Sequence, residues 1–158
     1  MDEFEYRLFV QTTCGFGISV PATLTVCDVP EFTTQPTDVT VCSGDGWTFG
    51  PVSVTTKCPV TTYEWFVSTD GGSYWASVTS FFPVEGITAT DADTEVLMLG
   101  NITTRIQGFN FRLGATNECG TSYSNPASIT IYTAPTIYPD PPNVVPTATC
   151  EGGNFVIY

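Results

Sequence analysis

Six cysteines are the residues of this chain with the clearest chemistry. The chain has no histidine, and no two of its cysteines form a CxxC pair. Both facts argue against a structural zinc site, and the lack of histidine also removes the usual base for serine or cysteine nucleophiles. An even number of cysteines in an acidic chain rich in glycine and proline predicts disulfide bonds in an oxidising compartment. The cysteines are Cys14, Cys27, Cys42, Cys58, Cys119 and Cys150.

Acidic loops offer the best place for a cation. Asp91 and Asp93 are two residues apart, and Asp70 begins an Asp-Gly-Gly turn. Ca²⁺ takes about six to eight oxygen ligands, which the carboxylates and carbonyl groups of such loops can supply. The spacing matches no EF-hand or nonapeptide motif, so loops that only keep the protein soluble are the competing interpretation. Such carboxylate pairs could also hydrolyse glycosides, but a small β domain rarely builds the cleft required, and we expect no enzymatic activity.

Aromatic residues form a second candidate site. Tyr74 and Trp75, together with Trp47, Phe81 and Phe82, could stack on a sugar and make the chain a carbohydrate-binding module. The competing interpretation is that these rings cover an open sheet face or a contact between domains.

The charge of the chain excludes nucleic acid as a partner. Four Lys and Arg residues stand against 16 Asp and Glu, which gives a net charge of −12, so no basic surface is available to neutralise phosphates. No apolar run approaches the roughly 18 residues of a membrane span. The acidic N-terminus lacks the segments of a signal peptide. We therefore interpret the chain as an excerpt from a longer exported protein.

The local pattern is almost entirely that of short β-strands. Apolar and polar residues alternate in segments such as 22–26, 37–41, 62–67 and 128–132, which are separated by turn residues. The only plausible helical piece is one turn near residues 101–105. Many short strands at this spacing predict a sandwich or barrel.

The chain also repeats itself at an offset of 105 residues. Phe4-Glu5-Tyr6-Arg7-Leu8 aligns with Phe109-Asn110-Phe111-Arg112-Leu113, and Cys14-Gly15 aligns with Cys119-Gly120 without a gap. Cys42 corresponds to Cys150 after three inserted residues. The repeat therefore predicts three parts. Residues 1–29 are the C-terminal strands F and G of a preceding repeat, 30–134 form a complete domain, and 135–158 are the N-terminal strands A and B of a following repeat.

A unit of this size and strand number predicts an all-β immunoglobulin-like (Ig-like) sandwich. We expect strand A at 32–41, B at 47–55, C at 61–68, E at 94–99, F at 108–116 and G at 127–133, with a C′ or D segment around 74–75 and 81–82. Neither strand B nor strand F carries the usual inter-sheet cysteine. The core must therefore rely on Trp65, Phe49, Leu97, Leu99 and Leu113.

The sandwich brings two cysteines within reach of each other. Its B–C and F–G loops share one end, so a bridge between Cys58 and Cys119 is geometrically reasonable. Pairing elsewhere is the alternative, because six cysteines allow about 15 connectivities. A bridge between Cys27 and Cys42 is disfavoured, since the strand between them would hold them apart. Cys14 and Cys150 fall in incomplete repeats, so their partners can lie outside this chain.

Several strings resemble one family, the tandem Ig-like repeat of very large surface and secreted proteins of Bacteroidota, which include gliding adhesins and other type IX-secreted proteins. The resemblance is carried by Tyr63-Glu64-Trp65-Phe66-Val67, Asp70-Gly71-Gly72-Ser73-Tyr74-Trp75, Leu97-Met98-Leu99-Gly100-Asn101 and Ser124-Asn125-Pro126-Ala127. It implies export, an extended array of domains and an adhesive or scaffold role, without naming a ligand.

The expected function is therefore mechanical. We expect a stiff spacer or building block of a surface appendage, with neighbouring Ig-like repeats as partners. Short linkers that contain proline, such as 29–31 and 134–136, would limit bending between them. Two alternatives stay open: a module that binds a cell-surface glycan or receptor, and a subunit of an ordered filament in which other copies of the chain pair through unpaired strand edges. We expect no cofactor other than a possible Ca²⁺ ion.

Overall fold

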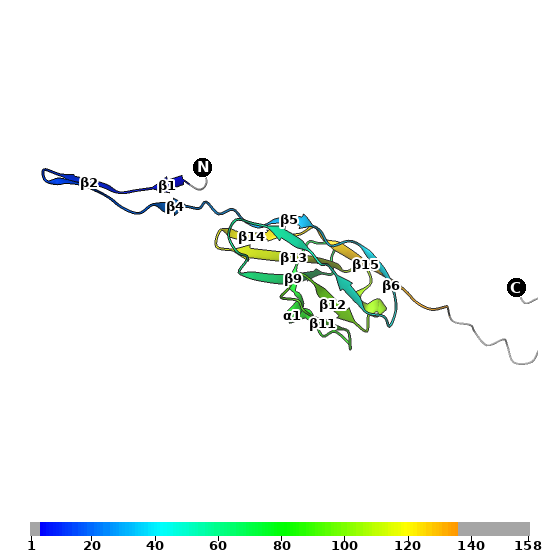
Figure 1. Cartoon of the computed structure of the whole chain (residues 1–158). Coiled ribbons are helices and arrows are strands. Elements are labelled where there is room, and N and C mark those ends of the chain that lie inside the picture. The colour runs from blue at the N-terminus through cyan, green and yellow to red at the C-terminus, as the bar shows by residue number, and fades with distance from the viewer. Residues whose placement is uncertain (1–3, 136–158) are drawn as a thin grey trace, which may run out of the picture.

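The fold is given by a computed structural model, which describes residues 4–135. The expected strands of a following repeat, and Cys150 with them, lie outside the described residues. The described part consists of an Ig-like β-sandwich and, on its N-terminal side, a long β-hairpin (Figure 1). Among the described residues no helix has the length and apolarity needed to cross a membrane.

The larger sheet of the sandwich is built around β13 (Asn110–Asn117), which pairs with β9 (Thr62–Ser68) along seven residues. The sheet continues to β10 (Ala76–Ser77) on one side and, on the other, to β15 (Ala127–Tyr132) and β6 (Val39–Cys42), while β14 (Gly120–Tyr123) also pairs with β13. The facing strands are β11 (Thr88–Thr90), β12 (Leu97–Gly100) and β7 (Trp47–Phe49).

Two expected strands are each broken into two. Strand A consists of β5 (Glu31–Thr34), which pairs with β8 (Ser53–Thr55), and of β6, which pairs in parallel with β15. Between them lies Pro36, which has no N–H group for a sheet hydrogen bond. Strand B divides into β7 and β8 at Gly50-Pro51, where Gly50 has a φ of +100° and its missing Cβ leaves room for the backbone oxygen of Glu95.

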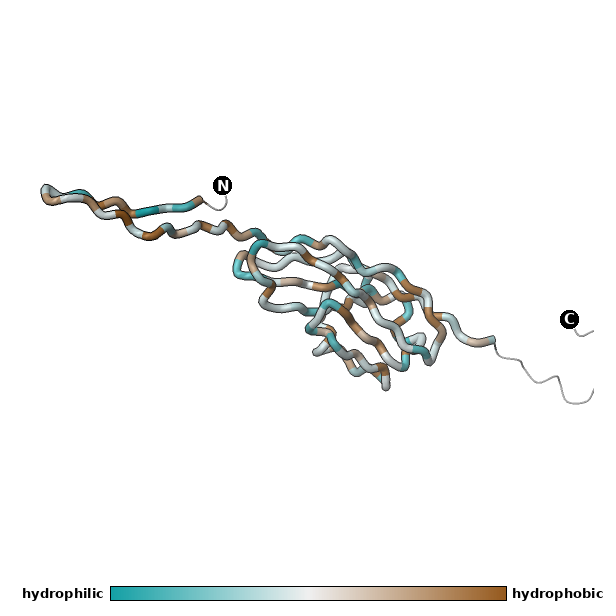
Figure 2. The backbone as a smooth tube through the Cα atoms, in the orientation of Figure 1, coloured by the Kyte–Doolittle hydropathy of each residue, from teal (hydrophilic) through white to brown (hydrophobic). Residues whose placement is uncertain are grey.

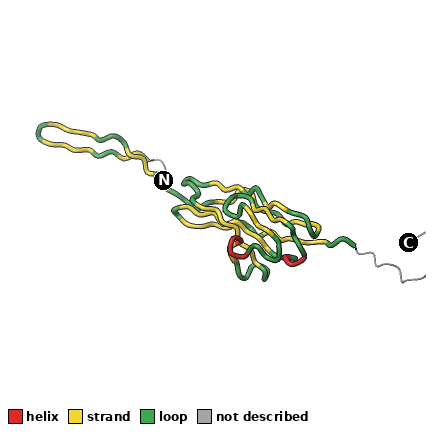
Figure 3. The backbone as a smooth tube through the Cα atoms, turned by 90° about the horizontal axis from the view of Figure 1, so that it is seen from below, coloured by secondary structure: helices red, strands yellow, loops and turns green. Residues whose placement is uncertain are grey.

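Within residues 4–135 helical structure is confined to two short pieces, which are red in Figure 3. The turn η1 (Thr104–Ile106) begins three residues after the start of the expected turn near 101–105 and overlaps it at Thr104 and Arg105. The single turn α1 (Val78–Phe81) replaces part of the expected C′ or D segment. Its residue Val78 is buried, and α1 packs against β9. A helix of only four residues is too short to produce a recognisable apolar period in the sequence.

Alternation along the strands fills the core. The five expected core residues, Trp65, Phe49, Leu97, Leu99 and Leu113, are all buried. Phe49 packs against both Trp65 and Phe111, with ring centroids 6.2 and 5.1 Å apart, and the indole nitrogen of Trp65 donates to the backbone oxygen of Thr94 over 3.0 Å. These large side chains stabilise the sandwich without a disulfide between its sheets.

The hairpin, residues 4–26, projects from one end of the sandwich, whereas β15 ends at the opposite end (Figure 1). It pairs β1 (Phe4–Tyr6) with β4 (Ala22–Leu24), and β2 (Phe9–Thr12) with β3 (Gly15–Ile18). Its apolar side chains are exposed in the described structure, and Figure 2 marks apolar residues as brown segments of the tube. An isolated two-stranded hairpin is marginally stable at best in water.

The hairpin reproduces the pairing of β13, β14 and β15 at the offset of 105 residues. Tyr6 lies opposite Ala22 as Phe111 lies opposite Ala127, and Phe9 lies opposite Ile18 as Gly114 lies opposite Tyr123. The Leu8 amide donates to Oγ of Ser19 over 2.9 Å, as the Leu113 amide does to Oγ of Ser124. The sequence repeat is thus also a repeat of strand register.

Candidate functional site

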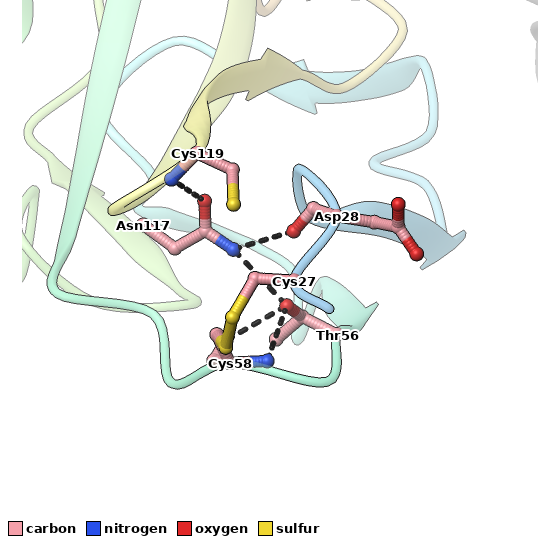
Figure 4. The surroundings of a disulfide bond; sticks show 6 residues. All are labelled: Cys27, Asp28, Thr56, Cys58, Asn117 and Cys119. Carbon is pink, nitrogen blue, oxygen red and sulfur yellow. Dashed lines mark hydrogen bonds between the residues drawn. A yellow bond between two sulfur atoms is a disulfide. The ribbon is translucent and has the colours of Figure 1, made fainter. Parts of the chain in front are cut away.

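The candidate site is the junction where the linker, residues 27–30, meets the sandwich. Cys27 of the linker forms a disulfide with Cys58, which follows β8, and their Cα atoms are 5.5 Å apart (Figure 4). The predicted bridge between Cys58 and Cys119 is therefore wrong. The linker meets the end of the sandwich that carries Cys58 and supplies its partner, whereas Cys119 in the turn between β13 and β14 stays free.

Asn117 is the residue that holds the junction together from the sandwich side. Its side chain is 4% exposed. Its Nδ2 donates to the backbone oxygen of Asp28 over 2.7 Å and to Oγ1 of Thr56 over 3.2 Å, while its Oδ1 accepts from the amide of Cys119 over 2.9 Å (Figure 4). One buried amide therefore connects the linker, the segment after β8 and the turn that follows β13.

Thr56 and Gly120 complete the contact. Oγ1 of Thr56 donates to the backbone oxygen of Cys58 over 2.7 Å and so shapes the short loop that presents the disulfide. Gly120 has a φ of +144°, and a Cβ built there would lie 3.3 Å from Val29. Glycine at this position serves both the conformation of the turn and the close approach of the linker.

The other cysteines do not enter the junction disulfide. Cys14, Cys42 and Cys119 are free and exposed in the described residues. Cys42 and Cys27 are not bonded to each other, since Cys27 pairs with Cys58.

Asp70 organises a turn. Its carboxylate accepts from Oγ of Ser68 over 2.8 Å and from the amide of Tyr74 over 2.9 Å. The amide of Tyr74 and the hydroxyl of Ser68 hold the pKa of this carboxyl below its ordinary value, because both donate to its charged form. These bonds explain the Asp-Gly-Gly-Ser string as a structural motif.

Asp91 and Asp93, the other two candidate cation ligands, lie in the turn before β12. The backbone oxygen of Asp91 accepts from the amide and the hydroxyl of Thr94. Among residues 4–135 no group of three His, Cys, Asp or Glu side chains is arranged to hold a metal ion.

Trp75 belongs to a stack on the outer face of the larger sheet. The guanidinium carbon of Arg112 lies 4.2 Å from the ring centroid of Trp75 and 4.1 Å from that of Tyr123. The indole nitrogen of Trp75 donates to the backbone oxygen of Gly72 over 3.0 Å. Burial lowers the pKa of Arg112. Trp75 therefore packs on a neighbouring cation, while Tyr74 is 72% exposed.

A small hollow lies beside this stack. It has a volume of about 100 Å³ and is lined by Thr62, Glu64, Phe66, Gly114, Thr116, Thr121 and Tyr123. Gly114 lets two of the lining rings lie close to β13, because a Cβ there would lie 3.0 Å from the ring of Phe66 and 3.1 Å from that of Tyr123. The lining thus combines two aromatic rings with hydroxyls and one carboxylate, a combination that suits a sugar ring.

Sequence reasoning missed Asn117, Arg112 and Tyr123. The hairpin has threonine at the position of Asn117, so the repeat gave no signal for it. Arg112 recurs as Arg7, and this repetition of a rare cation could have drawn attention to it.

Solved structures that are similar to this chain include tandem Ig repeats. No protein-family model matches the chain, and no curated protein matches it. One similar solved structure is described as tandem Ig repeats of Dlar, with 12% identity and a TM-score of 0.48 over 81% of this chain and 75% of that one. Another is the N-terminal Ig1-2 module of the Drosophila receptor protein tyrosine phosphatase DLAR, with 16% identity and a TM-score of 0.43 over 68% of this chain and 50% of that one. The Ig-like fold of the chain rests on its own strand order and on the core that its sheets enclose.

Proposed function

We propose that the chain is part of a tandem array of Ig-like repeats in a long extracellular bacterial surface protein, where it acts as a stiff spacer or building block. In this proposal residues 1–29 are the F and G strands of a preceding sandwich, 30–134 are a complete repeat, and 135–158 begin the next. The strings noted above that resemble repeats of Bacteroidota surface proteins support the assignment to a bacterial surface.

The repeated strand register supports the tandem arrangement. Leu8 and Leu24 of the hairpin are 67% and 46% exposed, whereas Leu113 and Ile129, which lie 105 residues further on, are fully buried. In the complete repeat these two positions belong to the buried core cluster of the sandwich. A preceding sandwich of the same design would bury the hairpin in the same way, which removes a large apolar surface from water.

The observation that carries the mechanical role is the disulfide between Cys27 and Cys58. A covalent bond and the hydrogen bond from Asn117 to Asp28 both fix the linker to the sandwich. Pro30, the last residue of the linker, is buried, and its ring restricts the backbone just before the sandwich begins. The hairpin and the end of β15 lie at opposite ends of the sandwich (Figure 1). A pulling force on the array would therefore act along the length of the sandwich.

The experiment uses an extended chain, in which a second copy of residues 30–108 is placed directly before Phe4 so that the hairpin completes a sandwich. Nuclear spin relaxation of the amides measures how the two sandwiches tumble. We expect one common correlation time in the oxidised protein and two independent ones in the reduced protein. Independent tumbling in the oxidised protein would reject the stiff spacer.

A second candidate function, recognition of a cell-surface glycan, is favoured by the hollow at Gly114. Phe66 and Tyr123 would contact the apolar face of a sugar, and Glu64 would accept from its hydroxyls. A glycan array screened with the full chain tests this role. Binding that is lost in Glu64→Ala and retained in Glu118→Ala would support it, and no binding above background would reject it.

A further inference from the structure

Cys42 lies at the downstream end of the sandwich, beside the position that corresponds to Cys27. It is the register partner of Tyr132 in the parallel pair of β6 and β15, and the amide of Ser43 donates to the backbone oxygen of Tyr132 over 2.8 Å. Tyr132 is 105 residues after Cys27. In a repeat completed around the hairpin, the residue equivalent to Cys42 would therefore lie on the strand next to Cys27.

Cys119 lies at the upstream end, against the linker. Its amide is bonded to Oδ1 of Asn117, whose Nδ2 is bonded to the backbone oxygen of Asp28. Figure 4 shows Cys119, Asn117 and Thr56 gathered around Cys27 and Asp28. A single side chain thus separates the backbone of Cys119 from the residue that follows Cys27.

Both cysteines recur in the flanking sequence. Cys14 occupies the position of Cys119 in the hairpin, and Cys150 corresponds to Cys42. Cys27, by contrast, is replaced by Tyr132 one repeat further on, and the position of Cys58 occurs only once in this chain. The two free cysteines of the complete repeat, Cys42 and Cys119, are therefore both seen to recur.

We propose that Cys42 of each repeat forms a disulfide with Cys119 of the repeat that follows it. This proposal rests on the tandem arrangement proposed above. At the one junction that the structure describes, the Cα atoms of Cys27 and Cys58 are 5.5 Å apart. The backbone of the linker therefore lies as close to the sandwich as a disulfide requires, since such bonds span about 4.4 to 6.8 Å between Cα atoms. Cys42 of an upstream repeat would reach the same junction from the neighbouring strand.

The bond forms by thiol–disulfide exchange with a small disulfide oxidant such as oxidised glutathione. The Cys42 thiolate attacks the oxidant and releases one thiol, and the Cys119 thiolate then displaces the second. Two protein thiols are oxidised to one disulfide while the oxidant is reduced to two thiols. A second cross-link from the adjacent strand would restrict rotation about the linker further than the disulfide between Cys27 and Cys58 does by itself.

The test uses the extended chain defined above, which contains the full chain and supplies Cys42 upstream of Cys119. The protein is oxidised in a glutathione buffer, alkylated with iodoacetamide, digested and analysed by mass spectrometry. We expect a peptide pair that joins Cys42 of the added copy to Cys119 and disappears on reduction, and we expect loss of alkylation at both residues. A folded extended chain with the disulfide between Cys27 and Cys58 intact, but with Cys42 and Cys119 fully alkylated, would overturn the proposal.

Two variants make the test specific. Cys42→Ser in the added copy should restore full alkylation of Cys119, whereas Cys42→Ser in the original copy should change nothing at Cys119, because that residue lies at the opposite end of its sandwich. Thermal unfolding of the same protein reports separately on the tandem arrangement. If only one sandwich unfolds cooperatively, the tandem arrangement is rejected, and the disulfide between repeats with it.

Discussion

Asn117 and Asp28 are joined by a hydrogen bond of 2.7 Å from the side-chain Nδ2 of Asn117 to the backbone oxygen of Asp28. A buried residue of the sandwich thus holds the backbone of the linker that enters it. The hydrogen bond joins segments that are 89 residues apart in the sequence. Together with the adjacent disulfide it fixes the linker to the sandwich.

Asn117→Ala should destabilise the oxidised protein by about 1 to 3 kcal/mol, because it leaves the Asp28 oxygen and the Cys119 amide without their partner. Urea unfolding monitored by tryptophan fluorescence measures this. The control is Asn110→Ala on the same strand, whose side chain makes only a 3.4 Å bond to Gly108 and whose loss should cost less than about 0.5 kcal/mol. Equal losses from both substitutions would contradict the role of Asn117.

Cys27→Ser should lower the free energy of unfolding by up to about 3 to 4 kcal/mol, since the disulfide closes a loop with a sequence separation of 31 residues. Reduction of the native protein should have the same effect and add nothing to the variant. Cys14→Ser, which removes a free cysteine of the hairpin, should leave the urea midpoint unchanged. A reduced protein as stable as the oxidised one would show that the linker disulfide contributes no stability.

Arg112→Met should destabilise the sandwich by about 1 to 2 kcal/mol, because it keeps the length of the side chain but removes the cation between Trp75 and Tyr123. Trp75→Ala should lose at least as much, whereas Tyr74→Ala should stay within about 0.5 kcal/mol. Thermal unfolding of the three variants measures these differences. An Arg112→Met variant of native stability would mean that the stack serves binding rather than folding.

Stability should fall at acid pH through Asp70 and Asp38. Hydrogen bonds from Tyr74 and Ser68 lower the folded-state pKa of Asp70, and those from Ser128 lower the pKa of Asp38, from an ordinary value of 3.8. Because the folded pKa values are depressed, this stability is fully present above pH 3.8 and is lost as the pH falls through them. Urea midpoints between about pH 2.5 and 6 should show this loss in the native protein and a weaker loss in Asp38→Asn/Asp70→Asn. An unchanged slope in the double variant would contradict it.

The repeat and the strand pattern predicted much of the fold. Alternation around Trp65 identifies the buried face of β9, and the offset between Phe4 and Phe109 anticipates the register of the hairpin. Both features are local or periodic, and such features can be recognised in a single sequence.

The partner of Cys58 could not be predicted in this way. The pairing depends on where the linker lies against the sandwich, and the spacing of the cysteines in the sequence does not determine that position. Arg112 was missed for a related reason. Its guanidinium group lies between Trp75, in the loop before β10, and Tyr123, in β14, and these residues are far apart in the sequence. These contacts are set by tertiary structure alone.

The measurement that decides most directly whether residues 4–26 are the F and G strands of a sandwich uses a hybrid domain, in which residues 30–108 are followed directly by 4–29. The hairpin then replaces 109–134 at the offset of 105 residues seen between Phe4 and Phe109. A control lacks one residue at the join, which turns the apolar face of the first hairpin strand outward. We expect the hybrid to unfold in one cooperative thermal transition and the control to show none. A hybrid that unfolds no more cooperatively than the control, while residues 30–134 fold normally, would contradict the tandem arrangement.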